Sequence, residues 1–278
     1  MELCVPRVVQ RPQECEPACL AMVLAHGGVS IDMDALIQET ATPRKYKDWE
    51  YLHGVAALRR GLRAYIVTRD PLLYDPSWAP LAPAQWVNRF RRRVEWVREE
   101  TAAGRGEAFP WFFEAAHETA LGFLDAGGEV VLRAPSLPLI AAVLSGGVPV
   151  IAPIQGALFY GDRFHQRHQD EIRGMPYGHV VVLAGWAGAA GTVSRLLVVD
   201  PSADSKVSGG RSWEDADEIL YANLIYMAPL LLVSAKPIAF PPDHASHERP
   251  RSADASRTTM GEALEDPAGI ASLATGSL

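Results

Sequence analysis

Apolar and polar residues follow one another along the first quarter of the chain in a pattern that predicts three helices and then a strand. Residues 17–26 are nearly all apolar. They begin with Pro17, which suits a first helical turn, and are followed by the pair Gly27-Gly28, which favours a helix end. A helix that is apolar on every side is expected to lie inside the core. Shorter helices are expected over about 30–39 and 49–60, and a strand over 63–68.

The second half of the chain contains short apolar runs separated by turn residues, which indicates strands. We expect strands at 130–133, 148–154, 180–186, 196–200 and within 225–234, one helix at 137–144 and a long polar loop at 155–177. Helices that precede a run of strands are typical of an α+β fold.

Residues 69–128 differ from the rest and are interpreted as a helical insertion. A Pro-rich loop is followed by two amphipathic patterns, which predict helices over about 84–103 and 110–126. The segment holds four of the seven tryptophans: Trp78, Trp86, Trp96 and Trp111. Two interpretations stay open. The aromatic side chains could simply pack the insertion, or the insertion could form a lid or a surface for a protein or carrier partner.

The domain is predicted to span residues 1–237. From 238 to 278, Pro, Ser, Ala and charged residues dominate and large apolar residues are few, so we expect a disordered tail.

Composition narrows the classes of function. The 278 residues carry a formal net charge of −7, which argues against a nucleic-acid partner because phosphate binding favours a basic surface. The longest apolar runs are too short to cross a bilayer, and the N-terminus lacks the pattern of a secretory signal. We therefore expect a cytoplasmic protein with no membrane partner. The bias toward Ala, Gly and Arg is typical of a GC-rich bacterial genome, so we also expect a bacterial source.

Three cysteines, Cys4, Cys15 and Cys19, are too few and too clustered for a disulfide framework. Cys15 comes just before the apolar helix, whose N-terminus would stabilise a thiolate. Cys19 lies one helical turn later and is expected in the core, and Cys4 is interpreted as structural. A buried structural cysteine remains the alternative for Cys15.

Two further residues share the expected position of Cys15 at the edge of a buried element. His179 begins an apolar strand, and Asp200 ends the next one, directly before Pro201. If these strands form a hairpin, His179 and Asp200 lie at the same edge of the sheet. The carboxylate could then hold one ring nitrogen while the other faces the thiol. A Cys, a His and an Asp in these positions match the generalised logic of a catalytic triad.

The segments around these residues resemble a known family. Residues 10–28 (QRPQECEPACLAMVLAHGG) resemble the opening of the double-glycine, or bacteriocin-leader, peptidases, family thirty-nine of the cysteine peptidases, and especially their stand-alone relatives. Residues 178–186 (GHVVVLAGW) and 199–201 (VDP) resemble the family's His and Asp segments, in the family's order, and residues 139–153 resemble the strand before the His. The resemblance covers roughly 1–68 and 130–235.

The resemblance implies a papain-like fold, with N-terminal helices packed on a C-terminal antiparallel sheet. It also implies an oxyanion-binding amide upstream of Cys15, for which Gln10 is the first candidate and Gln13 the second. Gln10 stands five residues before Cys15, one fewer than is usual in the family. Such a donor is typically worth about 10²–10³ in rate.

The implied function is a cysteine peptidase-like hydrolase that cleaves a peptide or amide bond through a thioester, with Cys15, His179 and Asp200 as its triad and no cofactor. Two alternatives stay open: an amide-forming acyltransferase with the same triad, and a non-catalytic module that binds peptides. The His165-x-x-His168 loop, with Asp162, Asp170 and Glu171, is interpreted as solvated rather than as a metal site. His26, His53 and His117 are assigned no role.

Overall fold

The computed structural model describes residues 1–41, 49–106, 112–161, 172–173, 175–189 and 192–242. Its helices are α1 (Cys15–His26), α2 (Met33–Thr40), α3 (Trp49–Leu58), α4 (Pro83–Ala102), α5 (Phe113–Asp125), α6 (Leu137–Ser145), α7 (Gly156–Tyr160) and α8 (Ala216–Tyr226), with a 3₁₀ turn, η1 (Pro76–Trp78). Its strands are β1 (Arg63–Thr68), β2 (Glu129–Leu132), β3 (Val150–Gln155), β4 (Gly178–Ala187), β5 (Arg195–Val199), β6 (Arg211–Asp215) and β7 (Leu230–Ser234).

The strands form one sheet in the order β2-β1-β7-β3-β4-β5-β6. Every pair in it is antiparallel except β1 with β2. Helices α1, α2 and α3 precede all of the described strands, and α1 and α3 pack on the sheet. The α+β fold is therefore confirmed. The strand expected over 63–68 is β1, which belongs to the same sheet, whereas its parallel pairing with β2 was not predicted from the sequence.

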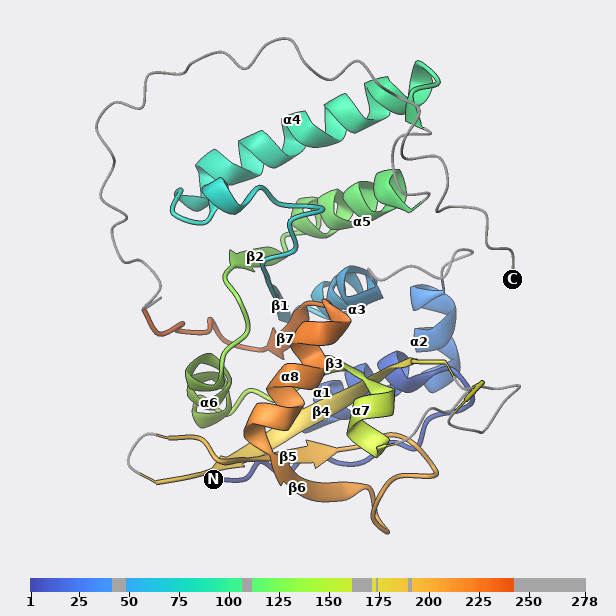
Figure 1. The fold of residues 1–278 in the computed structure, drawn as a ribbon, viewed down its shortest axis with the longest axis vertical. Helices are drawn as coiled ribbons and strands as arrows, with labels where there is room; N and C mark the ends of the chain where they lie inside the picture. Colours follow the sequence, from blue (N-terminus) through green and yellow to red (C-terminus); the bar gives the residue numbers. More distant parts are fainter. Residues whose placement is uncertain (42–48, 107–111, 162–171, 174, 190–191, 243–278) are drawn as a thin grey trace. The chain divides into compact units, whose positions relative to one another are not determined.

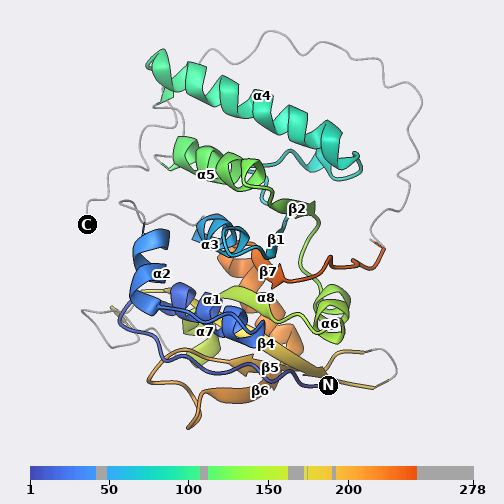
Figure 2. The same ribbon diagram turned by 180° about the vertical axis from the view of Figure 1, so that it is seen from behind.

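Both faces of the sheet are buried because successive strand residues point to opposite sides. In β4, Val180 and Val182 belong to the core that contains α1 and α3, whereas Val181 and Leu183 belong to the core that contains α6 and α8. Figure 1 shows α8 in front of the sheet, and the view from behind in Figure 2 shows α1 and α3 on the other side. A strand covered on both faces reads as a continuous apolar run, which is how residues 180–186 read.

The segment 69–128 connects β1 to β2, and its two long helices are those that the sequence predicted. Arginines of α4 pair with acidic residues of α5: Arg98 with Glu118 and Arg91 with Asp125. Of the tryptophans in this segment, Trp78 and Trp86 are buried and Trp96 is 43% exposed. Trp111 lies outside the described residues. Trp78 and Trp86 thus contribute to the packing of the segment.

Two expectations need correction. Residues 155–177 are not one long loop, because α7 occupies Gly156–Tyr160, and the sequence pattern also missed α8 and β6. The tail boundary at 238 is too early. Ile238 and Phe240 pack against the core, and the Phe240 ring meets the Tyr65 ring edge to face with 5.5 Å between their centroids. Residues 243–278 lie outside the described part of the chain.

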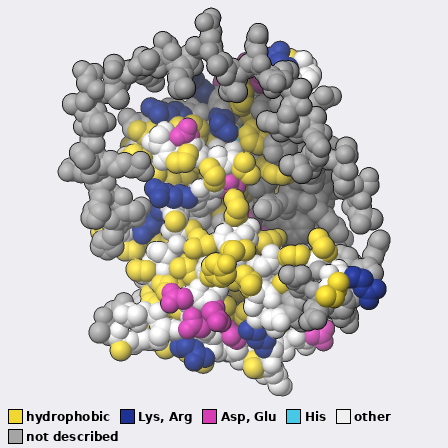
Figure 3. Space-filling model, in the orientation of Figure 1, with side chains coloured by type: hydrophobic (Ala, Val, Ile, Leu, Met, Phe, Trp, Pro, Cys, Tyr) yellow, Lys and Arg dark blue, Asp and Glu magenta, His cyan; other side chains and the backbone are white. Residues whose placement is uncertain are grey.

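The outer face of α8 carries exposed apolar side chains. Tyr221, Leu224 and Ile225 are each about half exposed, with 57%, 46% and 48% of their surface accessible. In Figure 3 hydrophobic side chains gather over this helix, with an acidic group at its N-terminal end, where Asp217 and Glu218 occupy the first turn. Among the helices of the described residues, none is long and apolar enough to cross a membrane.

Candidate functional site

Cys15 is the first residue of α1, which begins two residues before the start expected at Pro17. Every residue from Glu16 to Leu24 is buried, so the helix is fixed in the core and Cys15 stands half-buried at its N-terminal end. The residue before it, Glu14, makes no side-chain cap hydrogen bond to the first turn. The partial positive charge of a helix N-terminus favours an anion there, which for Cys15 is the thiolate.

His179 and Asp200 come together at the same edge of the sheet. His179 is the second residue of β4, and Asp200 directly follows β5, which pairs with β4 in antiparallel fashion. Their side chains are 7% and 3% exposed, and His179 Nε2 lies 2.8 Å from Asp200 Oδ1. The hairpin expected from the sequence is therefore present.

Cys15 is also close enough to the His179 ring to be one of the groups that raise its pKa. Because Nε2 faces Asp200, Nδ1 is the nitrogen left for the sulfur. Burial alone would lower the pKa of His179, but the hydrogen bonds and charges of Asp200 and Cys15 outweigh it and raise the pKa to about 9. The ring is thus held as an imidazolium near neutral pH, between a carboxylate and a thiol.

Asp200 is held from several directions. Its Oδ1 accepts the backbone N–H of Ser202 at 2.9 Å, and its Oδ2 accepts the hydroxyl of Tyr160 at 2.8 Å. Its backbone carbonyl accepts Arg7 Nε at 2.8 Å. Burial would raise the pKa of Asp200, but the His179 partner, helped by Ser202 and Tyr160, lowers it below its ordinary value. The carboxylate therefore stays ionised beside the imidazolium.

Tyr160 is a site residue that the sequence analysis missed. It is the last residue of α7, and its hydroxyl lies 3.2 Å from His179 Nε2 as well as 2.8 Å from Asp200 Oδ2. One local signal existed: Gly161 adopts a left-handed conformation with φ of 75°, and a glycine in that position is a common helix end. A helix of five residues is too short to give a periodic pattern.

The two amide candidates lie in different environments. The backbone N–H of Gln10 donates to the carbonyl of Pro201 at 2.8 Å, which fixes Gln10 next to the residue that follows Asp200. Its side-chain Oε1 is buried, without a hydrogen-bond partner among the described residues. Gln13 is exposed and has a left-handed backbone with φ of 65°. Of the two, Gln10 is the one whose backbone is joined to the His179–Asp200 edge.

The other two thiols differ in exposure. Cys19 is fully buried, and its thiol donates to the carbonyl of Val180 at 3.3 Å. Burial, followed by the charges of Cys15, Asp200 and Glu16, raises the pKa of Cys19 well above its ordinary value. Cys4 is exposed. Cys19 therefore belongs to the core, and Cys4 offers an internal reference for an accessible thiol.

Further ionisable groups lie close to Cys15. Glu16 and His53 are both 2% exposed, with Glu16 Oε1 3.5 Å from His53 Nδ1. Burial, followed by the charges of Glu50, Glu16 and Cys15, raises the pKa of Tyr226 to about 12. The Tyr226 hydroxyl lies against Gly178, where an added Cβ would collide with it. These groups were not predicted from the sequence as neighbours of the site.

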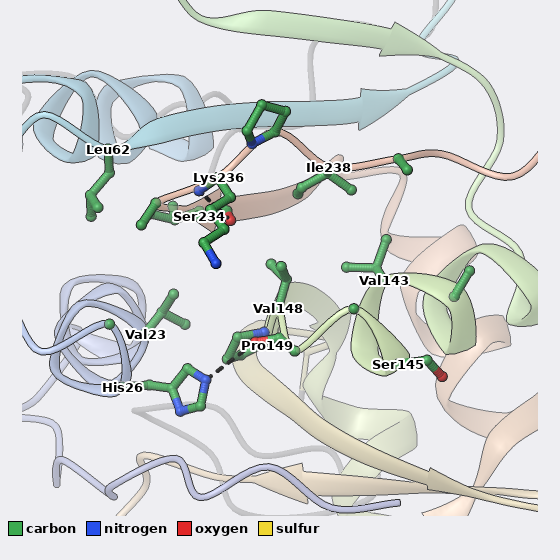
Figure 4. A pocket seen from close by; sticks show the side chains of 18 residues that line it. Val23, His26, Leu62, Val143, Ser145, Val148, Pro149, Ser234, Lys236 and Ile238 are labelled. Atoms are coloured by element: carbon green, nitrogen blue, oxygen red, sulfur yellow. Dashed lines mark hydrogen bonds between the residues drawn. The ribbon is translucent and has the colours of Figure 1, made fainter.

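A cavity of about 670 Å³ lies at the other end of α1, away from Cys15. Its lining includes His26, the last residue of α1, together with Val148, Lys236 and Ile238, and none of the triad residues (Figure 4). The His165-x-x-His168 loop lies outside the described residues. Within the described ranges, no group of three or more His, Cys, Asp or Glu side chains could hold a metal ion.

Comparisons with known proteins give one structural likeness. No family model matches the chain, and no curated protein sequence matches it. A crystal structure of a Bacillus anthracis protein described as a C39-like peptidase is similar over 85% of this chain and 96% of that chain, with 13% identity and a TM-score of 0.38. At these values the likeness adds nothing on the chemistry of the site, which rests on the residues themselves.

Proposed function

We propose that the chain is a cysteine peptidase-like hydrolase in which Cys15 is the nucleophile, His179 its acid–base partner and Asp200 the residue that orients His179. The observation that carries the proposal is the arrangement of the His179 ring. One nitrogen lies 2.8 Å from the buried Asp200 carboxylate, and Cys15, at the start of α1, is near enough to the ring to help raise its pKa. A nucleophile, a base and an orienting carboxylate grouped in this way are the arrangement that thiol catalysis requires.

The proposed reaction proceeds in two steps. The Cys15 thiolate attacks the carbonyl carbon of a peptide or amide, and the His179 imidazolium donates its proton to the leaving amine. This leaves a thioester on Cys15. Water then attacks the thioester, His179 removes the water proton, and the acid product leaves with regeneration of the thiolate. Through both steps Asp200 remains ionised and stabilises the imidazolium.

We further propose that the oxyanion formed in each step is stabilised by the side-chain amide of Gln10 and the backbone N–H of Cys15. Support comes from the Gln10 backbone, which is hydrogen-bonded to Pro201 directly after Asp200. Preorganised donors of this kind stabilise developing charge without reorganising.

Thiol alkylation tests the proposal without a known substrate. Rates of iodoacetamide modification at Cys15, Cys4 and Cys19 would be measured by mass spectrometry from pH 5 to 9 in the wild type, Cys15→Ala, His179→Ala and the size-matched His179→Gln. A free thiol is mostly protonated below a pH of about 8.5. We expect Cys15 to react at least tenfold faster than exposed Cys4 at pH 6, and to lose this advantage in both His179 variants.

If Cys15 reacts no faster than Cys4 at pH 6, the catalytic proposal is wrong and a peptide-binding module is the better description. If the advantage depends on His179, peptide and amide substrates would be supplied with and without amine acceptors. Products of hydrolysis support the proposed hydrolase. Amide products that outcompete hydrolysis would instead identify an acyltransferase.

A further inference from the structure

A phenol occupies the space between the two residues that support the nucleophile. The Tyr160 hydroxyl lies 2.8 Å from Asp200 Oδ2 and 3.2 Å from His179 Nε2. The imidazole and the carboxylate are themselves 2.8 Å apart, through Nε2 and Oδ1. The three polar groups therefore form a closed ring of contacts in which each side chain meets the other two.

The protons in this ring can be assigned from chemistry. Tyr160 has one hydroxyl proton, and burial, followed by the Asp200 charge, raises the pKa of the phenol, so the hydroxyl stays protonated. An ionised carboxylate can only accept, so the hydroxyl donates to Asp200 Oδ2. The His179 Nε2–H then donates to Oδ1 and has the phenol oxygen as a second acceptor. This arrangement requires the proton on Nε2 and leaves Nδ1 for the sulfur of Cys15.

We propose that Tyr160 is a positioning residue of the site: its hydroxyl fixes the plane of the Asp200 carboxylate and thereby the orientation and tautomer of His179. The inference rests on the proposed function, since it concerns the same nucleophile. The carboxylate has two oxygens, and without Tyr160 only Oδ1 keeps partners, in Nε2 and the Ser202 N–H. A carboxylate tethered through one oxygen is free to turn about its bond to Cβ.

The hydroxyl can be separated experimentally from the packing of the ring. The Tyr160 ring meets Phe159 edge to face at 4.9 Å and stacks against Tyr177 at 6.5 Å between centroids. Tyr160→Phe keeps both ring contacts and removes only the oxygen. The titratable or charged groups that face the pair are Cys15 and Cys19 from α1, Tyr160 from α7, and Arg7 at the Asp200 backbone.

The test is the pH profile of Cys15 alkylation in the full chain, compared for the wild type and Tyr160→Phe, with Tyr221→Phe as the matched control. Tyr221 is on the exposed face of α8, so its variant loses a hydroxyl that lies in solvent. Tyr160→Phe loses a hydrogen bond to a charged group. We therefore expect Cys15 in this variant to be alkylated about tenfold more slowly than Cys15 in the wild type at pH 5. At pH 10, above the His179 pKa of about 9, the two rates should converge, because most of the imidazolium has then lost its proton.

A double variant shows whether Tyr160 acts through Asp200. In an Asp200→Asn background, adding Tyr160→Phe should change the alkylation rate by less than about twofold, because the partner of the hydroxyl is already altered. A full additional tenfold loss would overturn the inference. So would a Tyr160→Phe profile that coincides with those of the wild type and Tyr221→Phe.

Failure of the inference is distinct from failure of the proposed function. If His179 controls Cys15 reactivity and Tyr160→Phe has no effect, only the role of Tyr160 is lost. If the alkylation rate of Cys15 is the same in the wild type and in His179→Ala, both the inference and the proposed function are wrong. Should Tyr160→Phe lower the melting temperature, the rates are compared below it, and a uniform slowing at every pH would count against the inference.

Discussion

At the scale of single residues, Gly210 leaves room for the Arg7 side chain to contact the backbone of Asp200. Its carbonyl accepts the backbone N–H of Asp200 at 2.8 Å, and its φ is 64°, in the left-handed region that favours glycine. A Cβ at this position would collide with the Arg7 guanidinium and would lie 2.7 Å from the Asp200 carbonyl oxygen. The absence of a side chain here thus permits the Arg7 contact with the backbone of Asp200.

Gly210→Ala is predicted to weaken both the fold and the site. The left-handed backbone alone costs about 1–2 kcal/mol for a residue with a Cβ, and the collision should add a further 1–3 kcal/mol or so. Gly209→Ala is the matched control, because Gly209 has a φ of 87° and nothing lies within 4 Å of its Cβ position. Urea unfolding measures the difference. Equal losses in the two variants would show that the Arg7 contact is not disturbed.

The two glutamines give a second prediction at this scale. Once a substrate is found, Gln10→Ala should lower kcat by about 10²–10³ while Gln13→Ala has little effect, because an oxyanion donor acts in the transition state. Alkylation of Cys15 by iodoacetamide forms no oxyanion, so Gln10→Ala should leave that rate nearly unchanged. A kcat loss in Gln13→Ala instead of Gln10→Ala would reassign the donor.

At the scale of elements, the parts of the site carried by long or continuous apolar segments could be predicted. The helix that begins at Cys15 is buried on every side, and β4 and β5 are consecutive strands joined by a short connection, so their ends had to meet. The sequence did not reveal α7, which has only five residues, or α8. Along α8, the exposed Leu224 and Ile225 lie next to buried Ala222 and Asn223, which hides the helical period.

The packing of α4 on α5 contains a buried histidine that the sequence analysis left without a role. His117 Nε2 lies 3.1 Å from Arg93 Nε, which donates to it, and Nδ1 lies 2.8 Å from the Phe113 carbonyl. Its ring stacks on Phe90. Burial is the main cause that lowers the pKa of His117 to about 4. The folded protein therefore holds this ring neutral.

This helix pair is predicted to weaken in mild acid. The folded pKa of His117 lies below its ordinary value of 6.5, so the unfolded chain binds more protons between pH 6.5 and 4. The free energy of unfolding should fall by about 2 kcal/mol from pH 7 to pH 5 through this group. Urea unfolding of the wild type and His117→Gln at both pH values checks it. An equal acid loss in the variant would assign the effect to other groups.

At the scale of the whole molecule, one sheet has helices on both faces, and the site lies where β4 begins and β5 ends. Local sequence patterns predicted every described strand except β6, but they did not predict how distant strands pair. The parallel contact of β1 with β2 joins residues on either side of the 69–128 segment, and β7 lies between β1 and β3. For the same reason, Tyr160 and Asp200, 40 residues apart, could not be recognised as partners.

Stability of the whole chain should pass through a maximum near pH 6.5. Below pH 6.5, the stability falls because the unfolded chain protonates His117 more readily than the folded chain does. On the alkaline side, the folded pKa of His179, about 9, lies above its ordinary value of 6.5. The stabilisation from His179 is therefore fully present below pH 6.5 and is lost as the pH rises through 9, by about 3 kcal/mol. The lowered pKa of Asp200 affects the stability only below its ordinary value of 3.8, which is outside this pH range.

Urea unfolding from pH 5 to 9 should give a dome-shaped dependence of the free energy of unfolding on pH. His179→Gln should flatten the dome on the alkaline side, and His117→Gln should flatten it on the acid side. An alkaline loss that persists in His179→Gln would mean that the imidazolium held between Asp200 and Cys15 does not contribute to the fold.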